Sequence, residues 1–253
     1  MFAEFADKTA LVVGGTTGIG ESIVHAFLGC GCNVVFAGIE AELGIALQRS
    51  LQNKHAGRAL FVRTDVRIES QVESLIRFAE EHFGKIHFAV NNAGYEGPFG
   101  PIQDAEETEF DRIIATNLKG VWLGMKHEIK HMLRYGSGSI VNTSSSAGVV
   151  SIPQVGIYSA SKHGIIGLSK AAALEQARAG IRINVIAPGP VRTGLLSRMV
   201  EGKIGLDEIA ELVPMGRISE PSEIAQGVLW LCSDAASYIT GHTLVLDGGL
   251  TVA

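Results

Sequence analysis

A tyrosine and a lysine, Tyr158 and Lys162, stand four residues apart near the start of a long helical pattern. In a helix this spacing places both side chains on one face, one turn apart. A free tyrosine has a pKa of about 10 and is a poor base at neutral pH, but a nearby ammonium favours the phenolate and lowers that pKa. The pair could therefore take the proton of a substrate hydroxyl. On its own, such a pair is more often part of a solvated helix face.

A glycine-rich turn follows the first apolar run of the chain. The run 11–13 leads into Gly14, Gly18 and Gly20, and a helical pattern begins at Glu21. Glycines let the backbone approach a pyrophosphate closely, while a helix N-terminus offers free N–H groups and the positive end of a dipole. Tight turns also need glycine for structural reasons alone, but the position between a strand and a helix favours a dinucleotide site. A P-loop is excluded because no Lys follows the last glycine.

The segment His127-Glu128-Ile129-Lys130-His131 is a literal H-E-x-x-H pattern in a predicted helix. Such a pattern places two imidazoles on one helix face, as in zinc proteases. A catalytic zinc site also needs a third protein ligand and an open position, and no residue downstream stands at the spacing expected of such a ligand. We therefore interpret the segment as a solvated helix face and predict that the protein needs no metal.

The elements that position these residues alternate along the chain. Seven short runs, mostly apolar, are typical of strands covered on both faces, and they are residues 11–13, 33–37, 60–62, 88–90, 139–141, 183–186 and 243–246. Helical patterns lie between them, for example at 21–28, 70–83, 106–135, 158–179 and 221–233. This alternation predicts an α/β fold with a doubly wound, seven-stranded parallel sheet in one domain, residues 1–253. Residues 194–213 interrupt the alternation and are predicted to form a substrate loop or lid.

Composition excludes several classes of function. Of the 253 residues, 46% are hydrophobic and 19% are charged, which excludes a disordered chain. The net charge of −5 argues against a nucleic-acid binder, and no apolar run reaches the roughly 18 residues of a membrane span. The first residues lack the basic region of a signal peptide. Three cysteines without metal spacing indicate a reducing compartment, which we interpret as the cytoplasm.

Five motifs in order resemble those of the short-chain dehydrogenase/reductase family, in its compact single-domain subgroup. The motifs are Gly14-x-x-x-Gly18-x-Gly20, Asn91-Asn92-Ala93-Gly94, Asn117, Ser145 with Tyr158-x-x-x-Lys162, and Pro188-Gly189-Pro190-Val191-Arg192-Thr193. The resemblance covers essentially the whole chain and implies a Rossmann-like fold and NAD(P)-dependent oxidoreductase activity. One departure is Val13, which stands where the family usually has a Thr that steadies the glycine turn. We therefore expect a slightly looser turn that still binds the cofactor.

The resemblance implies a role for each matched residue. Tyr158 takes the substrate's hydroxyl proton as hydride leaves for the nicotinamide, and Ser145 donates a hydrogen bond to the same oxygen. Lys162 also holds the nicotinamide ribose, and Asn117 holds a water in a proton relay to solvent. Asp65 contacts the adenine ring, although a turn or cap Asp would look the same. The implied cofactor-binding residues are Gly14, Thr17, Gly18, Ile19, Gly20, Gly38, Asp65, Val66, Asn91, Ala93, Gly94, Tyr158, Lys162, Pro188, Gly189, Val191 and Thr193.

We interpret the function as the interconversion of a secondary alcohol and a ketone. The candidate substrate residues, mostly apolar, are Tyr95, Glu96, Val149, Ile152, Leu195, Leu196 and Met199. Their character favours a small to medium hydrophobic substrate such as a cyclic alcohol or dihydrodiol. A 3-oxoacyl carrier-protein reductase is the nearest alternative, and it would favour NADPH and a basic docking face. A non-catalytic, cofactor-sensing scaffold is an alternative of another class, and it should have lost part of the active site. The resemblance also implies a homotetramer.

The residue at the end of the second strand, Gly38, bears on the choice between NAD and NADP. NAD-dependent relatives usually carry Asp there, and NADP-dependent relatives often follow a small residue with Arg, whereas this chain continues with Ile39 and Glu40. A 2′-phosphate would bring nearly two negative charges to a place without an evident cation. The sequence therefore predicts NAD, with NADP not excluded, and a distant cation such as Arg63 could reverse the preference by folding into reach.

Overall fold

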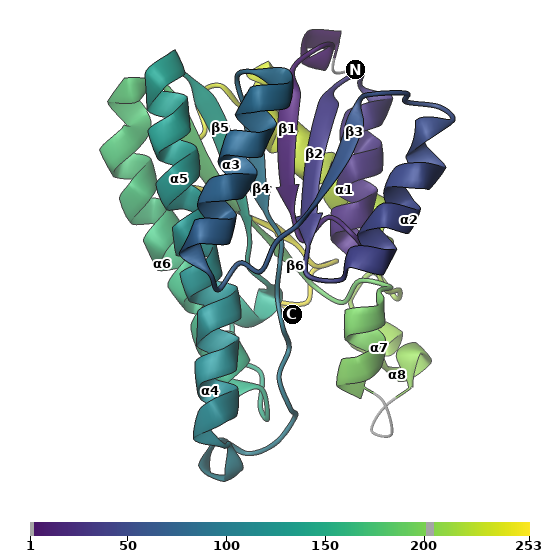
Figure 1. Cartoon of the computed structure of the whole chain (residues 1–253). Coiled ribbons are helices and arrows are strands. Elements are labelled where there is room, and N and C mark those ends of the chain that lie inside the picture. Colours follow the sequence, from purple (N-terminus) through teal and green to yellow (C-terminus); the bar gives the residue numbers. More distant parts are fainter. Residues whose placement is uncertain (1–2, 201–204) are drawn as a thin grey trace.

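The computed structural model describes residues 3–200 and 205–253 of the chain. Seven parallel strands form one sheet in the order β3-β2-β1-β4-β5-β6-β7 (Figure 1). The strands are β1 (Thr9–Val13), β2 (Asn33–Gly38), β3 (Ala59–Arg63), β4 (Phe88–Asn91), β5 (Gly138–Thr143), β6 (Ile181–Pro188) and β7 (Thr243–Leu246). Each contains a run that the sequence predicts as a strand, so the predicted doubly wound α/β fold is confirmed.

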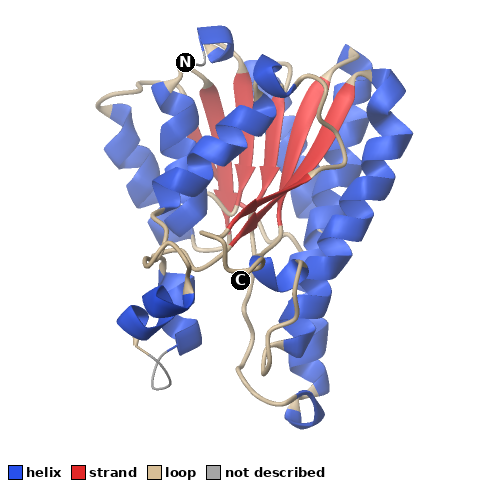
Figure 2. Ribbon diagram, turned by 180° about the vertical axis from the view of Figure 1, so that it is seen from behind, coloured by secondary structure: helices blue, strands red, loops and turns tan. Residues whose placement is uncertain are grey.

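Helices cover both faces of the sheet (Figure 2). One face is covered by α1 (Gly18–Gly29), α2 (Ala41–Gln52) and α9 (Pro221–Cys232), and the other by α3 (Glu69–Phe83), α5 (Gly120–Tyr135) and α6 (Gly156–Gln176). Side chains alternate along a strand, so Val12 of β1 packs into the first core and Leu11 into the second, both fully buried. Apolar residues on both faces of β1 therefore follow from the two helical layers.

Three short helices lie beyond the carboxyl ends of the strands (Figure 1). These are α4 (Glu107–Ile113) on one side and α7 (Gly194–Val200) with α8 (Leu206–Leu212) on the other. Strand β1 pairs with β2 on one edge and with β4 on the other, so the strand order reverses at β1. Ligands of open α/β sheets bind outside the carboxyl ends of the strands at such a reversal, and the glycine-rich turn follows β1 directly.

The helical pattern predicted over 106–135 is not one continuous α-helix. It consists of α4, a π-helical turn at Ile114–Lys119 and α5. Turns of π-helix are rare and often occur at functional sites. Asn117 lies in this turn and is fully buried.

The predicted lid, residues 194–213, contains α7 and α8, whereas its positions 201–204 lie outside the described residues.

Within the described ranges, no helix has both the length and the apolar character that a membrane crossing requires.

Candidate active site

The predicted proton-transfer pair lies in the first turns of α6. Tyr158 and Lys162 are only 8% and 3% exposed, and Lys162 Nζ lies 5.5 Å from the centroid of the Tyr158 ring. Lys162 Nζ donates a hydrogen bond of 3.0 Å to the carbonyl oxygen of Thr143, at the end of β5. Of the three N–H donors of the ammonium, two have no partner within the described part of the chain and remain available to a ligand.

Burial shifts the pKa of both groups in opposite directions. It raises the pKa of Tyr158 to about 12, and the negative charge of Glu96 acts the same way, while a hydrogen bond with Ser145 opposes the shift. Burial lowers the pKa of Lys162 to about 8. The sequence predicts a lowered pKa for Tyr158, but in the chain alone the loss of solvent outweighs the hydrogen bond with Ser145, and the pKa is raised. Tyr158 is therefore a neutral phenol near pH 7, the form that donates a proton.

Ser145 is the second residue after β5, and its side chain forms a hydrogen bond with that of Tyr158. Its backbone is extended, and its hydroxyl oxygen accepts a hydrogen bond of 3.1 Å from the backbone N–H of Ala147. A hydroxyl that accepts this bond still has its own hydrogen to donate. Ser145 can therefore direct that hydrogen toward an oxygen at the Tyr158 hydroxyl.

Asn117 connects the loop after β4 to α6. Its Oδ1 accepts from the Tyr95 N–H at 2.7 Å, and its Nδ2 donates to the Tyr95 carbonyl at 2.9 Å and to Ser161 Oγ at 3.1 Å. Ser161 Oγ in turn donates to the carbonyl of Tyr158 at 2.7 Å. Both amide hydrogens of Asn117 are used, so only its oxygen atoms remain to bind a water. The residue holds the loop and the catalytic helix in one arrangement.

The turn between β1 and α1 fits a dinucleotide. Gly14 has a φ of +77°, and a Cβ there would lie 2.5 Å from the backbone nitrogen of Ala93, while a Cβ at Gly20 would collide with the carbonyl oxygen of Gly14. Thr17 precedes α1 and makes no side-chain capping bond. The N–H groups of the first turn of α1 are therefore left for an anionic ligand, which is what a pyrophosphate requires.

Val13 does not leave this turn unsupported. The N–H groups of Gly14 and Gly15 both donate to the carbonyl of Ala37, at 2.8 and 2.9 Å. Asn92 Nδ2 donates to the carbonyl of Gly14 at 3.0 Å. These bonds support the turn without the missing threonine hydroxyl, and the slightly looser turn stays a prediction.

The segment after β6 lies against the glycine turn. A Cβ at Gly18 would lie 3.1 Å from Thr193 Cγ2, and one at Gly189 would lie 2.8 Å from the Cα of Asp247. A Cβ at Gly94 would lie 3.5 Å from Lys162 Nζ. Of the other predicted cofactor residues, Val66 and Val191 belong to the two buried cores, and Ile19 and Ala93 pack against them. Pro188 ends β6.

The adenosine end of the predicted site contains a cation. Arg63 Nε donates a hydrogen bond of 3.2 Å to the carbonyl of Ile39, so its guanidinium stands beside the residue that follows Gly38. A Cβ at Gly38 would lie 2.7 Å from Thr16 Cγ2, which explains the small residue at this position. The carboxylate of Asp65 accepts from Arg67 Nη2 at 2.6 Å, and this bond is the main reason that the pKa of Asp65 lies below its usual value.

The H-E-x-x-H segment is buried, and its interpretation as a solvated helix face is wrong. His127, Glu128 and His131 are 9%, 0% and 2% exposed. His127 Nε2 pairs with Glu69 Oε1 at 3.1 Å, and His131 Nε2 accepts from the backbone N–H of Ile86 at 2.9 Å. The two imidazoles thus have separate protein partners. Among residues 3–200 and 205–253, no group of three or more His, Cys, Asp or Glu side chains is placed to hold a metal.

The side chain of Asn91 binds the buried carboxylate of Glu128. Asn91 Nδ2 donates to Glu128 Oε2 and to Asn142 Oδ1, both at 2.9 Å. Asn91 is predicted to bind the cofactor, but its side chain points into the core between β4 and α5. Burial raises the pKa of Glu128 to about 7, and Glu128 Oε1 has no hydrogen-bond partner among the described residues.

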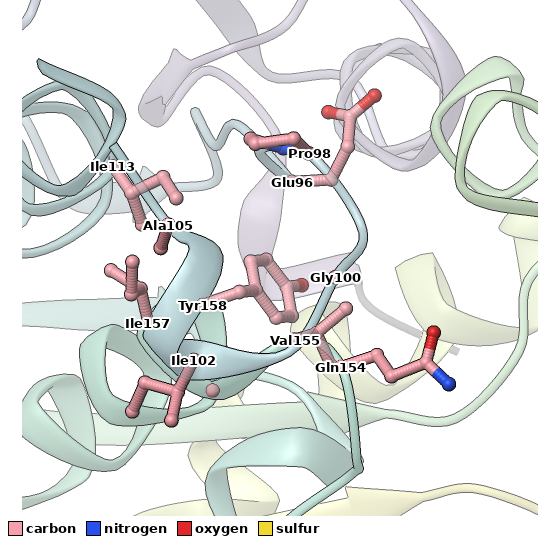
Figure 3. Close-up of a pocket in the computed structure, with 11 residues that line it drawn as sticks. Glu96, Pro98, Gly100, Ile102, Ala105, Ile113, Gln154, Val155, Ile157 and Tyr158 are labelled. Atoms are coloured by element: carbon pink, nitrogen blue, oxygen red, sulfur yellow. The ribbon is translucent and has the colours of Figure 1, made fainter. Parts of the chain in front are cut away.

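A pocket opens beside Tyr158 on the substrate side. Figure 3 shows Tyr158 among residues from the loop after β4, from the segment before α4 and from the start of α6. Most lining residues are apolar, including Pro98, Ile102 and Ile157. The polar exceptions besides Tyr158 are Glu96 and Gln154.

The predicted substrate residues divide into two groups. Ile152 and Met199 pack against the small buried cluster that contains Tyr158, and Leu195 and Leu196 are half-buried on α7. By contrast, Val149 is exposed, and the Tyr95 hydroxyl donates to Glu109 Oε2 at 3.0 Å, so its side chain is turned toward α4.

Glu96, in the loop after β4, forms an ion pair with Arg198 of α7. Arg198 of α7 approaches it with Nε at 2.6 Å from Oε1 and Nη2 at 3.4 Å from Oε2. The Glu96 side chain is 7% exposed and that of Arg198 is 62% exposed. The pair therefore joins a buried carboxylate in the loop after β4 to the outer surface of α7.

Several residues of this site cannot be found from the sequence motifs. They are Thr143, whose carbonyl accepts from Lys162, Ser161 and Arg198. Thr143 lies two positions before Ser145, and Ser161 directly precedes Lys162. Their closeness to motif residues in the sequence is a weak indication that they belong to the site. Arg198 lies 102 positions from Glu96, and nothing in the sequence pairs them.

Comparison with known proteins agrees with this geometry. The family model described as "Enoyl-(Acyl carrier protein) reductase" matches residues 13–251. The chain is 38% identical over 251 residues to the 2,5-dichloro-2,5-cyclohexadiene-1,4-diol dehydrogenase of Sphingobium indicum, covering 98% of this chain and 99% of that protein. The solved structure of levodione reductase superposes with a TM-score of 0.95 at 34% identity, covering 98% and 99% of the two chains.

A second solved structure, ElxO with NADP bound, has a TM-score of 0.91 at 33% identity and covers 97% of this chain and 99% of that one. Matches of this extent show that the chain belongs to the short-chain dehydrogenase/reductase family. The resemblance drawn from the motifs is confirmed. Within that family the chain is an NAD(P)-dependent enzyme of the type that acts on CH–OH groups.

Proposed function

We propose that this enzyme interconverts a secondary alcohol on a small ring and the corresponding ketone. The observation that carries the proposal is the placement of Tyr158, Ser145 and Lys162 around one position beside a mostly apolar pocket. The similar 2,5-dichloro-2,5-cyclohexadiene-1,4-diol dehydrogenase has a ring substrate in its name. This supports a cyclic alcohol or dihydrodiol over a carrier-protein thioester. The presence of all four catalytic residues argues against a non-catalytic scaffold.

The chain's own groups account for the proton. In the reductive direction, neutral Tyr158 donates its phenolic proton to the ketone oxygen, and Ser145 donates a hydrogen bond to that oxygen as negative charge develops on it. Lys162 favours the resulting phenolate by its charge. Asn117 Oδ1 and Lys162 Nζ both border the space in front of Gly94, where a water would connect them to solvent. A bound nicotinamide supplies or accepts the hydride.

For the cofactor we propose NAD as the preferred form, with weaker use of NADP. Gly38, Ile39 and Glu40 offer no cation of their own to a 2′-phosphate. Arg63, held at the carbonyl of Ile39, still has N–H donors that could meet a phosphate. Arg63 is therefore the residue on which NADP use depends. Asp65, Thr17 and the glycine turn are the proposed contacts of the shared part of both cofactors.

We further propose that residues 194–213 act as the substrate loop, because α7 brings Met199 to the Tyr158 cluster and Arg198 to Glu96.

We propose a homotetramer as the assembly. It is supported by exposed apolar side chains along α4 and α5, namely Phe110, Trp122, Leu133 and Tyr135. Sedimentation analysis tests the tetramer.

We propose the cytoplasm as the location of the protein. Three free cysteines, Cys30, Cys32 and Cys232, accord with this location, and cell fractionation tests it.

A substrate panel followed by nicotinamide absorbance tests the proposed function. The purified enzyme is offered cyclohexanol, ring diols and the matching ketones, with NAD and NADP and in both directions. We expect turnover of ring substrates and a higher kcat/KM with NAD. Turnover of 3-oxoacyl thioesters with NADPH, and not of ring substrates, would instead establish the carrier-protein reductase.

A further inference from the structure

Gly38 ends β2 at the place where dinucleotide-binding folds often carry an acidic residue. In such folds that acid follows the glycine turn by about 20 residues and binds the 2′-hydroxyl of the adenosine ribose. Here the side chain of Thr16, in the glycine turn, lies against the backbone of Gly38. A Cβ at Gly38 would lie 2.7 Å from Thr16 Cγ2 and 2.9 Å from Thr16 Oγ1. A side chain at position 38 would therefore collide with Thr16.

Rotation of the Thr16 side chain does not remove this collision. Its two γ atoms occupy two of the three staggered positions about the Cα–Cβ bond, and both lie too close to the Cβ position of residue 38. Every other rotamer replaces only one of them by a hydrogen, so at least one γ atom stays in the way. The Cβ of Thr16 itself lies farther off, at 3.4 Å, which is an ordinary contact. The collision thus belongs to the γ atoms alone.

The backbone is held in place on both sides of this contact. The N–H of Gly15 donates to the carbonyl of Ala37 at 2.9 Å, which ties the glycine turn to the end of β2. The carbonyl of Gly38 accepts from the N–H of Thr64 at 2.9 Å, directly after β3. Separating these segments would break the bonds. Thr16 therefore excludes an acidic side chain from position 38.

The hydroxyl of Thr16 is free to bind a ligand. It has no hydrogen-bond partner in the described part of the chain, and the residue is only half-buried at the end of β2. A hydroxyl can donate one hydrogen bond and accept two, whereas an ionised carboxylate only accepts. Thr16 can therefore accept from a ribose 2′-hydroxyl or donate to a 2′-phosphate, and its neutral side chain repels neither group.

We propose that Thr16 determines how this enzyme selects its cofactor. Its γ atoms exclude an acidic residue from position 38, and its hydroxyl binds the 2′ oxygen of the adenosine ribose in place of that acid. NADP is then rejected only weakly, because no carboxylate at position 38 faces the 2′-phosphate. This inference rests on the cofactor use proposed above and is independent of the ring substrate.

Three single variants test the hydroxyl. The readout is the dissociation constant of NADH and of NADPH, measured by fluorescence titration without substrate. Thr16→Val keeps two γ atoms and loses the hydroxyl, so both cofactors should bind about 2- to 10-fold more weakly, which is the effect of one hydrogen bond. Thr16→Ser keeps the hydroxyl and should bind them as the parent does. Thr108→Val, at an exposed position of α4, is the matched control and should change neither constant.

A second set of variants tests the exclusion. Gly38→Asp alone should weaken NADH binding, because the new side chain meets the γ atoms of Thr16. Thr16→Ala with Gly38→Asp removes those atoms and leaves only the contact at 3.4 Å. In this double variant NADH binding should recover, and NADPH binding should fall by about 10-fold or more. Thr16→Val with Gly38→Asp keeps the γ atoms and should behave like Gly38→Asp alone.

The comparison of the two double variants decides the exclusion. NADH binding that recovers with Thr16→Ala but not with Thr16→Val supports it, and equal binding in both would overturn it. If Gly38→Asp fails to fold, the same rescue is measured by thermal unfolding. Unchanged binding in Thr16→Val would overturn the contact between the hydroxyl and the ribose. A parent enzyme that binds NADPH more tightly than NADH would refute the proposed NAD preference alone, because the double variants still test Thr16.

Discussion

The replacement Glu128→Gln should change how the stability of this protein depends on pH. Glu128 is fully buried between α5 and β4. Burial raises the pKa of its carboxyl from 4.5 to about 7, opposed by the hydrogen bond from Asn91. The folded chain therefore retains a proton that the unfolded chain has released, so stability is lost as pH rises from 4.5 to about 7.

The size of this loss follows from the two pKa values. The difference between 4.5 and about 7 corresponds to about 3 kcal/mol at 1.36 kcal/mol per pH unit. An amide in place of the carboxyl cannot ionise, so the variant lacks this loss. At pH 5 we expect the variant to be no more stable than the parent, because Glu128 Oε1 has no partner in the described structure and an amide N–H there would lack an acceptor. At pH 8 the comparison should have moved in favour of the variant by about 1–3 kcal/mol.

Urea unfolding at pH 5, 6, 7 and 8 measures this difference, with protein concentration held fixed because any assembly changes apparent stability. Glu73→Gln, an exposed position on α3, is the matched control and should show a flat difference. All other titrating groups are the same in the variant and the parent, so their contributions cancel in the difference between the two unfolding free energies. A difference between Glu128→Gln and the parent that stays constant within about 0.5 kcal/mol from pH 5 to pH 8 would refute the reasoning.

Three other predictions concern the site. Tyr158→Phe should lower kcat by about 10²- to 10⁴-fold while NADH binding, followed by fluorescence, stays unchanged; activity within a few-fold of the parent would contradict its role as acid and base. Dialysis against a strong chelator should leave the rate unchanged, because hydride transfer needs no Lewis acid when Tyr158 and Ser145 polarise the oxygen; a rate that is lost and then restored by zinc would show otherwise. Arg63→Ala should weaken NADP binding about tenfold and leave NAD binding as it was, measured by titration with each cofactor; equal losses for both would mean that Arg63 does not meet the 2′-phosphate.

The parts of the fold that the sequence predicts are those set by local pattern. Each strand contains a short, mostly apolar run bounded by turn residues, so all seven could be found. The Tyr158–Lys162 pair depends only on the period of a helix. The break in the helix at Ile114–Lys119 could not be found, because residues in a π-helical turn do not differ in type from those of an α-helix.

The errors concern polar residues whose partners are distant in the sequence. His127, Glu128 and His131 have the composition of a solvated helix face, yet α5 packs against α3, β4 and the segment that joins them, which supply Glu69, Asn91 and the N–H of Ile86. These partners lie 58, 37 and 45 positions away. A buried polar group is satisfied by whichever donor or acceptor the fold brings to it. Sequence spacing within one helix cannot reveal that donor.

Burial also decides how this site can work. The loss of solvent that raises the pKa of Tyr158 to about 12 makes it a ready acid and a poor base. Reduction of a ketone uses the protonated phenol and needs no further change in that group. Oxidation of an alcohol near pH 7 requires the phenolate, and a pKa of about 12 must then fall by about five pH units, which is roughly 7 kcal/mol. Lys162, whose own pKa is lowered to about 8 by burial, is a nearby cation that favours the phenolate when it is protonated. A bound oxidised nicotinamide would supply further positive charge next to Tyr158 and would favour its phenolate, so we expect the basicity of this buried tyrosine to depend on a filled cofactor site.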